Sequence, residues 1–376
     1  MINYDHLTKI YGEGEDAVTA LEDVTFTIEK GEVVIFLGPS GCGKTTTLRC
    51  TNRLESITRG KVLVNGQDVM DMDAVALRRQ MGYVIQDIGL FPNKTIAENI
   101  AVVPKLMGWD AKKIAARVDE LLSMVRLDPE LFRSRYPAEL SGGQQQRIGV
   151  ARGLAAEPEI LLMDEPFGAI DPINREQIQD EFLRLQEHLK KTIAFVSHDI
   201  HEAIKMGDKI ALFTDGRLVQ YDTPAMLLTH PKNKYVADFV GADRALKVLG
   251  IVLAKDIINP RPRNLVKGED SAEDVLKMIE EKGLRHAIVI EEGKPVGYVR
   301  PENLKYEQGH VRDLAEKYPI HISKRTPARD ILSYMLMLDL LTLCVVDDNG
   351  DFIGTVTYND IQKKVKESYT SDVEMD

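Results

Sequence analysis

The chain has 376 residues, of which 44% are hydrophobic and 28% are charged. These values are typical of a globular protein of about two domains and exclude disordered and fibrous classes. The formal net charge of −11 argues against a general nucleic-acid binder, which would carry a basic face. The three cysteines have no CxxC spacing, which argues against a disulfide framework or a zinc site and favours a reducing, cytosolic compartment.

No segment has the pattern of a targeting sequence or a membrane span. The first residues, MINYDHLTKI, lack the apolar core of a signal peptide. The best apolar run, residues 335–346, is interrupted by Asp339 and is shorter than the roughly 18 residues that a membrane helix needs. We therefore expect the protein to reach a membrane only through a partner.

The first 240 residues alternate short β-branched runs with longer helical patterns, which predicts an α/β domain with a largely parallel sheet. Buried strands are expected at 32–37, 160–163 and 193–196. Turn pairs at Asn65-Gly66 and Asp215-Gly216 predict two hairpins. The stretch from 96 to 140 has a helical pattern without a clear strand, which predicts a helical insertion.

Residues 38–45, Gly-Pro-Ser-Gly-Cys-Gly-Lys-Thr, match GxxxxGK[ST] between an expected strand and an expected helix. The glycines allow backbone N–H groups to curl around phosphate oxygens at the helix N-terminus. Lys44 would place a positive charge on the β- and γ-phosphates, and the Thr45 hydroxyl would bind Mg²⁺. An ordinary glycine-rich turn would not need this strand and helix around it.

Residues 160–165, Ile-Leu-Leu-Met-Asp-Glu, form an apolar strand that ends in two carboxylates. The strand would hold them at the carboxyl edge of the sheet, where ligands bind in open α/β folds. Asp164 is suited to bind Mg²⁺ through water, and Glu165 to orient or deprotonate an attacking water.

Residues 140–144, Leu-Ser-Gly-Gly-Gln, precede another helical pattern. Ser141 is a good N-cap, and Gly142 and Gly143 would expose backbone N–H groups at the helix start. A capped helix explains the serine and the glycines but not the whole pentapeptide.

Together these three motifs resemble those of the ATP-binding-cassette (ABC) family, over residues 1 to about 240. The resemblance implies a P-loop NTPase fold with a helical subdomain, ATP and Mg²⁺ as cofactors, and a head-to-tail pair of cassettes, either homo- or heterodimeric. Each ATP would lie between the P-loop of one chain and residues 141–144 of the other. The implied nucleotide contacts are Tyr11, Gly38, Pro39, Ser40, Gly41, Cys42, Gly43, Lys44, Thr45, Thr46, Ser141, Gly142, Gly143 and Gln144.

Single residues elsewhere match the same family. Tyr11 stands where the family stacks an aromatic ring on adenine. Gln86 matches a glutamine that reaches Mg²⁺ and faces the membrane partner, and His198 matches a histidine that contacts the γ-phosphate. Residues 168–171 match the dimer-contacting D-loop, although Gly168 replaces the serine of many members. The implied catalytic residues are Glu165, His198, Lys44 and Gln86, and the implied metal ligands are Thr45, Gln86 and Asp164.

Beyond residue 264 the chain repeats itself, because residues 271–304 align with 327–361. Each copy has the order helix, strand, turn, strand, helix, and two such copies are expected to bury a shared face. The expected boundaries are 1–240 for the ATP-binding domain, 241–263 for a linker, 264–309 and 310–370 for the two repeats, and 371–376 for an acidic tail.

The repeats resemble CBS modules, which pair and often bind adenine nucleotides. In the second copy, Thr357 and Asp360 match the ribose-phosphate motif of such modules and imply a regulatory nucleotide site. The first copy departs from the motif with Arg300 and Asn303. Regulation through ionic strength, sensed by the acidic tail, and a purely structural repeat are the alternatives.

A cassette followed by a CBS pair resembles the ATPase subunit of importers for glycine betaine, carnitine, choline or proline. This resemblance implies integral-membrane permease subunits, an indirect link to a solute-binding protein, no nucleic-acid partner, and a peripheral position on the cytoplasmic face of the plasma membrane. The alternatives are the ATPase of an importer for an amino acid, a sugar or a polyamine, and a non-transport ABC ATPase. A nucleotide sensor that hydrolyses little would not need both Glu165 and His198.

Overall fold

The computed structural model describes residues 1–86, 89–168 and 170–370. The chain forms two compact units. The first consists of Met1–Leu227 and Pro231–Val240, and the second of Leu228–His230 and the chain from Gly241 onward. The expected acidic tail, 371–376, lies outside the described residues.

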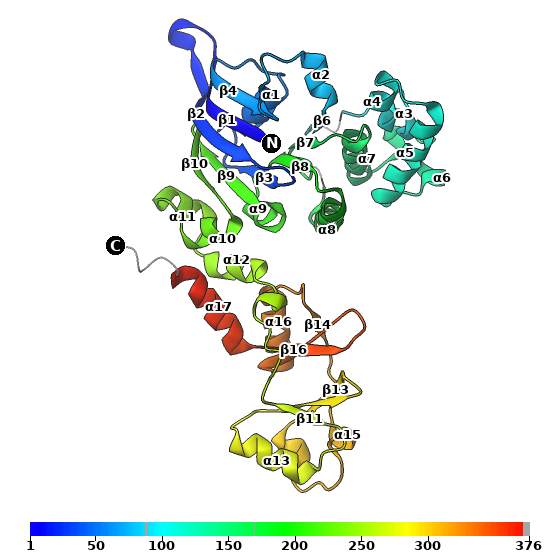
Figure 1. The fold of residues 1–376 in the computed structure, drawn as a ribbon, viewed down its shortest axis with the longest axis vertical. Helices are drawn as coiled ribbons and strands as arrows, with labels where there is room; N and C mark the ends of the chain where they lie inside the picture. The colour runs from blue at the N-terminus through cyan, green and yellow to red at the C-terminus, as the bar shows by residue number, and fades with distance from the viewer. Residues whose placement is uncertain (87–88, 169, 371–376) are drawn as a thin grey trace. The chain divides into compact units, whose positions relative to one another are not determined.

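An antiparallel sheet with strand order β2-β1-β4-β5 opens the first unit (Figure 1). Asn65 and Gly66 connect its last two strands with φ angles of 52° and 82°, the left-handed conformation that an Asn-Gly hairpin turn requires. The predicted hairpin is therefore confirmed. The strands are β1 (Ile2–Tyr11), β2 (Val18–Ile28), β4 (Arg59–Val64) and β5 (Gln67–Asp68).

A second sheet of the same unit has the order β10-β9-β3-β8-β7-β6. Its strands are parallel except β10, which pairs antiparallel with β9 through the predicted turn at Asp215-Gly216. β3, β7 and β8 are buried at every position, as expected for strands of a parallel sheet covered on both faces. The strands are β3 (Val33–Leu37), β6 (Met81–Val84), β7 (Ile160–Asp164), β8 (Thr192–Val196), β9 (Lys209–Thr214) and β10 (Arg217–Asp222).

The two sheets pack around an aromatic core. The rings of Tyr4 and Phe26 stack with centroids 4.4 Å apart, and Phe36 lies 5.8 Å from Phe213. Aromatic pairs of this kind each add about 0.5–1.5 kcal/mol beyond the burial of their area. This core fixes β3 and therefore the loop that follows it.

Helices flank the second sheet, and α3 to α6 gather as a separate group beside it (Figure 1). Between Ile96 and Leu140 the structure has helices and no strand, so the predicted helical insertion is confirmed. The helices up to residue 240 are α1 (Lys44–Thr51), α2 (Ala74–Arg79), α3 (Ile96–Ile100), α4 (Val102–Leu106), α5 (Ala111–Met124), α6 (Pro129–Phe132), α7 (Gly142–Leu154), α8 (Pro172–Leu189), α9 (Ile200–Met206), α10 (Pro224–Thr229) and α11 (Lys234–Val240), with 3₁₀ turns at Gly14–Asp16 and Pro137–Glu139.

The second unit contains two three-stranded sheets of the same design. In each, the first strand runs parallel to the second and the third runs antiparallel to it, which confirms the repeat. The strands are β11 (Leu265–Lys267), β12 (Ala287–Glu291), β13 (Lys294–Val299), β14 (Ile322–Ser323), β15 (Thr342–Val346) and β16 (Phe352–Thr357). The helices are α12 (Arg244–Ile251), α13 (Ala272–Glu281), α14 (Pro301–Leu304), α15 (Val311–Leu314), α16 (Ala328–Leu338) and α17 (Tyr358–Thr370), with a 3₁₀ turn at Ala254–Asp256.

Each repeat begins with a strand that the sequence analysis did not predict. β11 has three residues and β14 has two, too few to show an alternating pattern.

Residues 241–263, expected to be a linker, contain α12 and a 3₁₀ turn. The backbone of Asn259 also exchanges two hydrogen bonds with Thr355 of β16, at 2.8 and 2.9 Å. The segment before the first repeat is therefore part of the second repeat's structure.

Residues 310–316, which lie just after the expected boundary between the repeats, form backbone hydrogen bonds with the first repeat. Val311 donates a backbone hydrogen bond to Asp270, and Glu316 exchanges two with Tyr298. Residues 310–316 thus complete the first repeat.

Among the described residues, every helix is too short or too polar to span a membrane.

Candidate active site

The loop between β3 and α1 has the backbone of a phosphate-binding loop. Gly38, Gly41 and Gly43 have φ angles of 145°, 80° and 101°. A Cβ atom at Gly38 would lie 2.3 Å from the carbonyl oxygen of Phe213, and one at Gly43 would lie 2.5 Å from Leu21. Only glycine fits at these two positions. The loop ends at the N-terminus of α1, where free backbone N–H groups attract phosphate.

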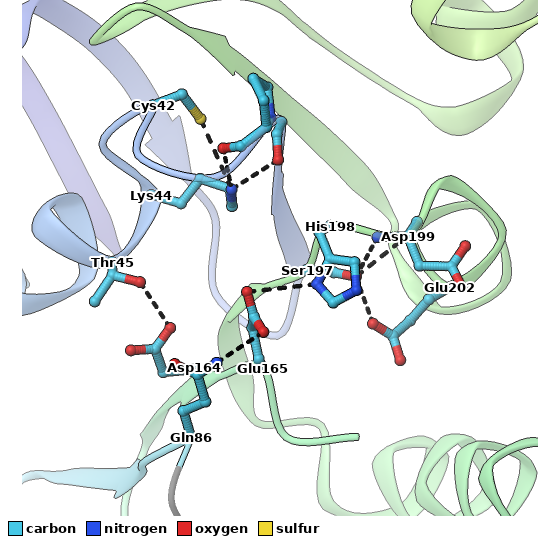
Figure 2. A network of polar contacts seen from close by, with 12 residues as sticks. Cys42, Lys44, Thr45, Gln86, Asp164, Glu165, Ser197, His198, Asp199 and Glu202 are labelled. Atoms are coloured by element: carbon cyan, nitrogen blue, oxygen red, sulfur yellow. Dashed lines mark hydrogen bonds and ion pairs between the residues drawn. The ribbon is translucent and has the colours of Figure 1, made fainter. Parts of the chain in front are cut away.

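The side chain of Lys44 turns back into this loop. Its Nζ atom donates hydrogen bonds to the carbonyl oxygens of Gly38 and Pro39, both at 2.7 Å (Figure 2). Lys44 is 5% exposed. Its ammonium group is therefore held inside the loop.

Thr45 and Asp164 form a pair of oxygen ligands beside the loop. The Thr45 hydroxyl donates to Asp164 Oδ1 at 2.9 Å. Burial raises the pKa of the Asp164 carboxyl, and the hydrogen bond from Thr45 partly offsets this rise. Mg²⁺ binds through one or two protein oxygens together with substrate phosphates rather than in an all-protein cage. The Thr45 hydroxyl and the Asp164 carboxylate are donors of this kind, so they fit Mg²⁺ carried with a nucleotide.

Side chains from three loops at the carboxyl edge of the sheet come together at Glu165 (Figure 2). It follows β7 with a left-handed φ of 44°. Gln86, which follows β6, donates from Nε2 to Glu165 Oε2 at 3.0 Å. His198, which follows β8, has Nδ1 3.4 Å from Glu165 Oε1. The carboxylate is thus oriented from both sides, and its remaining lone pairs can accept a hydrogen bond from water.

Tyr11 lies at the end of β1, next to the first turn of α1. Its ring is 38% exposed, and Lys9 Nζ lies 4.6 Å from the ring centroid. Burial raises the pKa of Tyr11, and a hydrogen bond with Thr46 of α1 partly offsets this rise. An exposed ring beside the phosphate loop is suited to stack on a base.

Ser141 and Gln144 bind each other instead of the phosphate loop. Ser141 Oγ accepts the Gln144 N–H at 3.4 Å, and Gln144 Oε1 accepts the Ser141 N–H at 3.0 Å. This reciprocal cap starts α7. Within the described chain the structure gives these two residues no hydrogen bond to residues 38–46 or to Glu165. One chain therefore brings together Lys44, Thr45, Gln86, Asp164, Glu165 and His198, and leaves 141–144 apart from them.

Arg49 belongs to the site and was missed by sequence reasoning. It lines the same cavity as Gln86 and Asp164, and its charge opposes the rise that burial causes in the pKa of Asp164 and of Tyr83. A single arginine in a helix carries no sequence signal, and only its position one turn after Thr45 in α1 could have suggested a role.

In the second repeat, Thr357 and Asp360 form the N-terminal cap of α17. Thr357 Oγ1 donates to Asp360 Oδ2 at 2.6 Å, and Asp360 N–H donates back to Thr357 Oγ1 at 3.1 Å. In the first repeat, Asn303 caps α14 by accepting the Arg300 N–H at 3.0 Å. Capping alone accounts for both pairs.

A phosphate loop that opens a helix, an acidic pair at the end of a parallel strand of the same sheet, and a glutamine and a histidine on the second carboxylate together define an ATP-hydrolysing cassette of the ABC type. Residues 21–168 match the family described as ABC transporter, and residues 254–308 and 311–367 each match the CBS domain.

Curated relatives match almost the whole chain. The osmoprotectant import ATP-binding protein OsmV of Salmonella typhimurium is 45% identical over 95% of this chain and 94% of its own. The carnitine transport ATP-binding protein OpuCA of Listeria monocytogenes is 44% identical over 95% of this chain and 90% of its own. The chain belongs to the family of ABC transporter ATP-binding subunits that carry a CBS pair, and it is a transport-coupled ATPase.

The cassette MJ0796, solved as a dimer, is 34% identical, with a TM-score of 0.55 over 60% of this chain and 99% of its own. A second structure of MJ0796 is a dimeric post-hydrolysis state with bound ADP and Pi.

Proposed function

We propose that this chain couples ATP binding and hydrolysis to the uptake of a quaternary-amine osmoprotectant of the glycine betaine, carnitine, choline or proline type. It would act on the cytoplasmic face of the plasma membrane with integral-membrane permease subunits, which receive solute from a solute-binding protein. The observation that carries the proposal is that cassette and CBS pair together align with osmoprotectant and carnitine transport proteins over 95% of the chain.

The site geometry supports a set of hydrolytic roles. Lys44 and residues 38–45 would bind the β- and γ-phosphates, and Thr45, Gln86 and Asp164 would hold Mg²⁺. When bound, Mg²⁺ neutralises charge on the phosphates. Glu165 accepts a proton from the attacking water, with its carboxylate oriented by Gln86 and His198. Catalysis then rests on positioning and on stabilisation of charge.

The site is completed by a second copy. The N-terminus of α7, capped by Ser141, presents backbone N–H groups that suit a γ-phosphate. The dimeric form of MJ0796 supports this arrangement.

The CBS pair regulates transport through an adenine nucleotide bound near Thr357 and Asp360. The matches of both repeats to the CBS domain support this proposal. The binding site would form around the cap of α17.

Uptake measurements test the transport function. The chain is reconstituted in vesicles with its membrane subunits and solute-binding protein, and ATP-dependent uptake of labelled glycine betaine, carnitine, choline and proline is measured beside a sugar and a polyamine. Uptake of at least one quaternary amine and of neither control is expected. Uptake of the sugar or the polyamine alone would contradict the proposed substrate class.

A further inference from the structure

Three buried polar side chains form a hydrogen-bonded cluster next to His198. Its members are Ser197 at the end of β8, Glu202 in α9 and Gln179 in α8, which are 1%, 9% and 5% exposed. Ser197 Oγ donates to Glu202 Oε2 at 2.5 Å, and Gln179 Nε2 donates to Glu202 Oε1 at 2.9 Å. Each carboxylate oxygen of Glu202 thus has its own donor in the protein interior.

The cluster fixes the backbone on both sides of His198. Ser197 N–H donates to the carbonyl oxygen of Phe36 in β3 at 3.0 Å. Ser197 Oγ also accepts the N–H of Asp199 at 3.0 Å, and the Asp199 side chain in turn caps α9 by accepting the N–H of His201 at 2.8 Å. His198 stands between these two anchored residues, with its ring turned toward Glu165 (Figure 2).

The other oxygen of Glu202 reaches the helix that follows the D-loop. Gln179 lies in α8, which begins at Pro172, directly after residues 168–171. Arg175 of the same helix donates to the carbonyl oxygen of Ile170 at 2.9 Å. The carboxylate of Glu202 therefore links the segment around His198 to the helix that directly follows the expected dimer contact.

The surroundings of Glu202 act on its pKa in both directions, with a net rise. Burial raises its pKa, but the hydrogen bonds from Ser197 and Gln179 and the charge of Arg175 oppose that rise, while Asp199 adds to it. The carboxylate of Glu202 contacts Ser197, the residue directly before His198, so it can affect the position of the His198 ring.

We propose that Glu202 is a positioning residue for ATP hydrolysis, which acts through Ser197 to hold the His198 ring against Glu165 and ties this segment to α8. The inference rests on the role proposed above for His198. It assigns Glu202 no contact with nucleotide. A loss of this anchor should lower kcat and leave the KM for ATP almost unchanged, because among the described residues no hydrogen bond links the cluster to the phosphate loop or to Tyr11.

Four variants of the full chain separate positioning from simple stability. Glu202→Met and Ser197→Ala each remove the hydrogen bond between Ser197 and Glu202. Glu202→Gln keeps an acceptor for Ser197, because the Gln179 amide can turn its oxygen toward the new N–H groups. The matched control is Asp180→Asn, which breaks a different link between α8 and α9, the ion pair of Asp180 with Lys205 at 2.7 Å.

The ATPase rate is measured over a range of ATP concentrations, with the unfolding temperature of each variant as a check on folding. Glu202→Met and Ser197→Ala should lower kcat by about tenfold to a hundredfold with little change in KM, as expected for a displaced catalytic group. The kcat of Glu202→Gln and of Asp180→Asn should stay within about threefold of that of the unaltered chain. This is a smaller loss than a misplaced catalytic group causes.

The decisive readout is the same change in a chain that already carries His198→Ala. Because Glu202 is proposed to act through His198, Ser197→Ala should cause almost no further loss there. A full multiplicative loss in this background, or unchanged kcat in a folded Ser197→Ala, overturns the inference alone. If His198→Ala itself leaves kcat unchanged, the proposed role of His198 fails and the inference fails with it.

Discussion

Thr45 and Asp164 are 119 positions apart in the sequence, yet the Thr45 hydroxyl donates to Asp164 Oδ1 at 2.9 Å. The sheet order brings them together, since β3 and β7 both flank β8 and end at the same edge. If the pair holds Mg²⁺, Asp164→Asn should raise the Mg²⁺ concentration needed for half-maximal ATPase activity by tenfold or more, because a charged ligand is lost. A Mg²⁺ titration of ATPase activity measures this, and an unchanged midpoint would remove Asp164 from the metal site.

Substitutions of Glu165 and of Lys44 should impair ATP hydrolysis in different ways. Glu165→Gln keeps the hydrogen-bonding shape toward Gln86 but cannot accept a proton, so turnover should fall by roughly 10²–10⁴-fold with ATP affinity nearly intact. Lys44→Ala removes the charge held between Gly38 and Pro39 and should weaken ATP binding. Nucleotide affinity and single-turnover rates distinguish the two. Near-normal turnover in Glu165→Gln would end its assignment as the base.

A mixture of two inactive chains should recover activity. Within one chain, residues 141–144 lie apart from the other site residues, so each complete site would need residues from two chains. A dimer of one Lys44→Ala chain and one Ser141→Arg chain should therefore contain one intact site. The mixture should show up to about a quarter of the unaltered rate, because half of randomly formed dimers are mixed and each has one working site. Hydrolysis at full rate by a strictly monomeric form would exclude a shared site.

The parts of the fold that the sequence predicts well are those specified by neighbouring residues. The GxxxxGK[ST] loop, the strand 160–163 and the Asn65-Gly66 turn depend on local spacing and β-propensity, and all three appear in the structure. β11 and β14 were missed because they form only by pairing with longer strands. The pairing of Asn259 with Thr355 was missed because it joins distant segments through backbone atoms alone, which no side-chain pattern encodes.

The site residues likewise divide into those that the sequence predicts and those that only the fold reveals. The roles of Gln86 and His198 came from family resemblance, since neither residue has a local pattern of its own, and the structure then places both on Glu165. Glu202 had no signal at all. A glutamate in a short helix is usually a solvated residue, and only the fold shows that this one is buried between two donors.

The CBS pair gives a prediction that separates ligand binding from capping. Asp360→Ala removes the carboxylate that accepts the Thr357 N–H in the cap of α17, together with the proposed nucleotide contact, whereas Ser271→Ala removes the hydroxyl that caps α13 in the first repeat. Each should cost about 1 kcal/mol of stability, but only Asp360→Ala should abolish binding of adenine nucleotides by a chain whose cassette is silenced by Lys44→Ala. Calorimetric titration with AMP, ATP and a cyclic adenine dinucleotide tests this. Binding by neither variant, or equal binding by both, would leave Asp360 as a helix cap only.

The pH dependence of stability gives an independent view of Glu202. Burial raises its pKa in the folded protein, so the folded state holds the proton more tightly than the unfolded chain does. The stability that this group contributes is therefore fully present below its unfolded pKa, near 4.3, and is lost as pH rises through the raised folded value.

Glu202→Gln does not titrate, so its unfolding temperature relative to the unaltered chain should increase from acidic to neutral pH and then stay level. At neutral pH the amide should be at least as stable as the carboxylate, because it removes a buried charge and keeps both hydrogen bonds. Calorimetry of both chains between pH 5 and 8 measures the difference, with Asp180→Asn as a control for a solvent-exposed carboxylate. A Glu202→Gln chain that loses stability relative to the unaltered chain as pH rises would show that the carboxylate is favoured by the fold and would contradict the raised pKa.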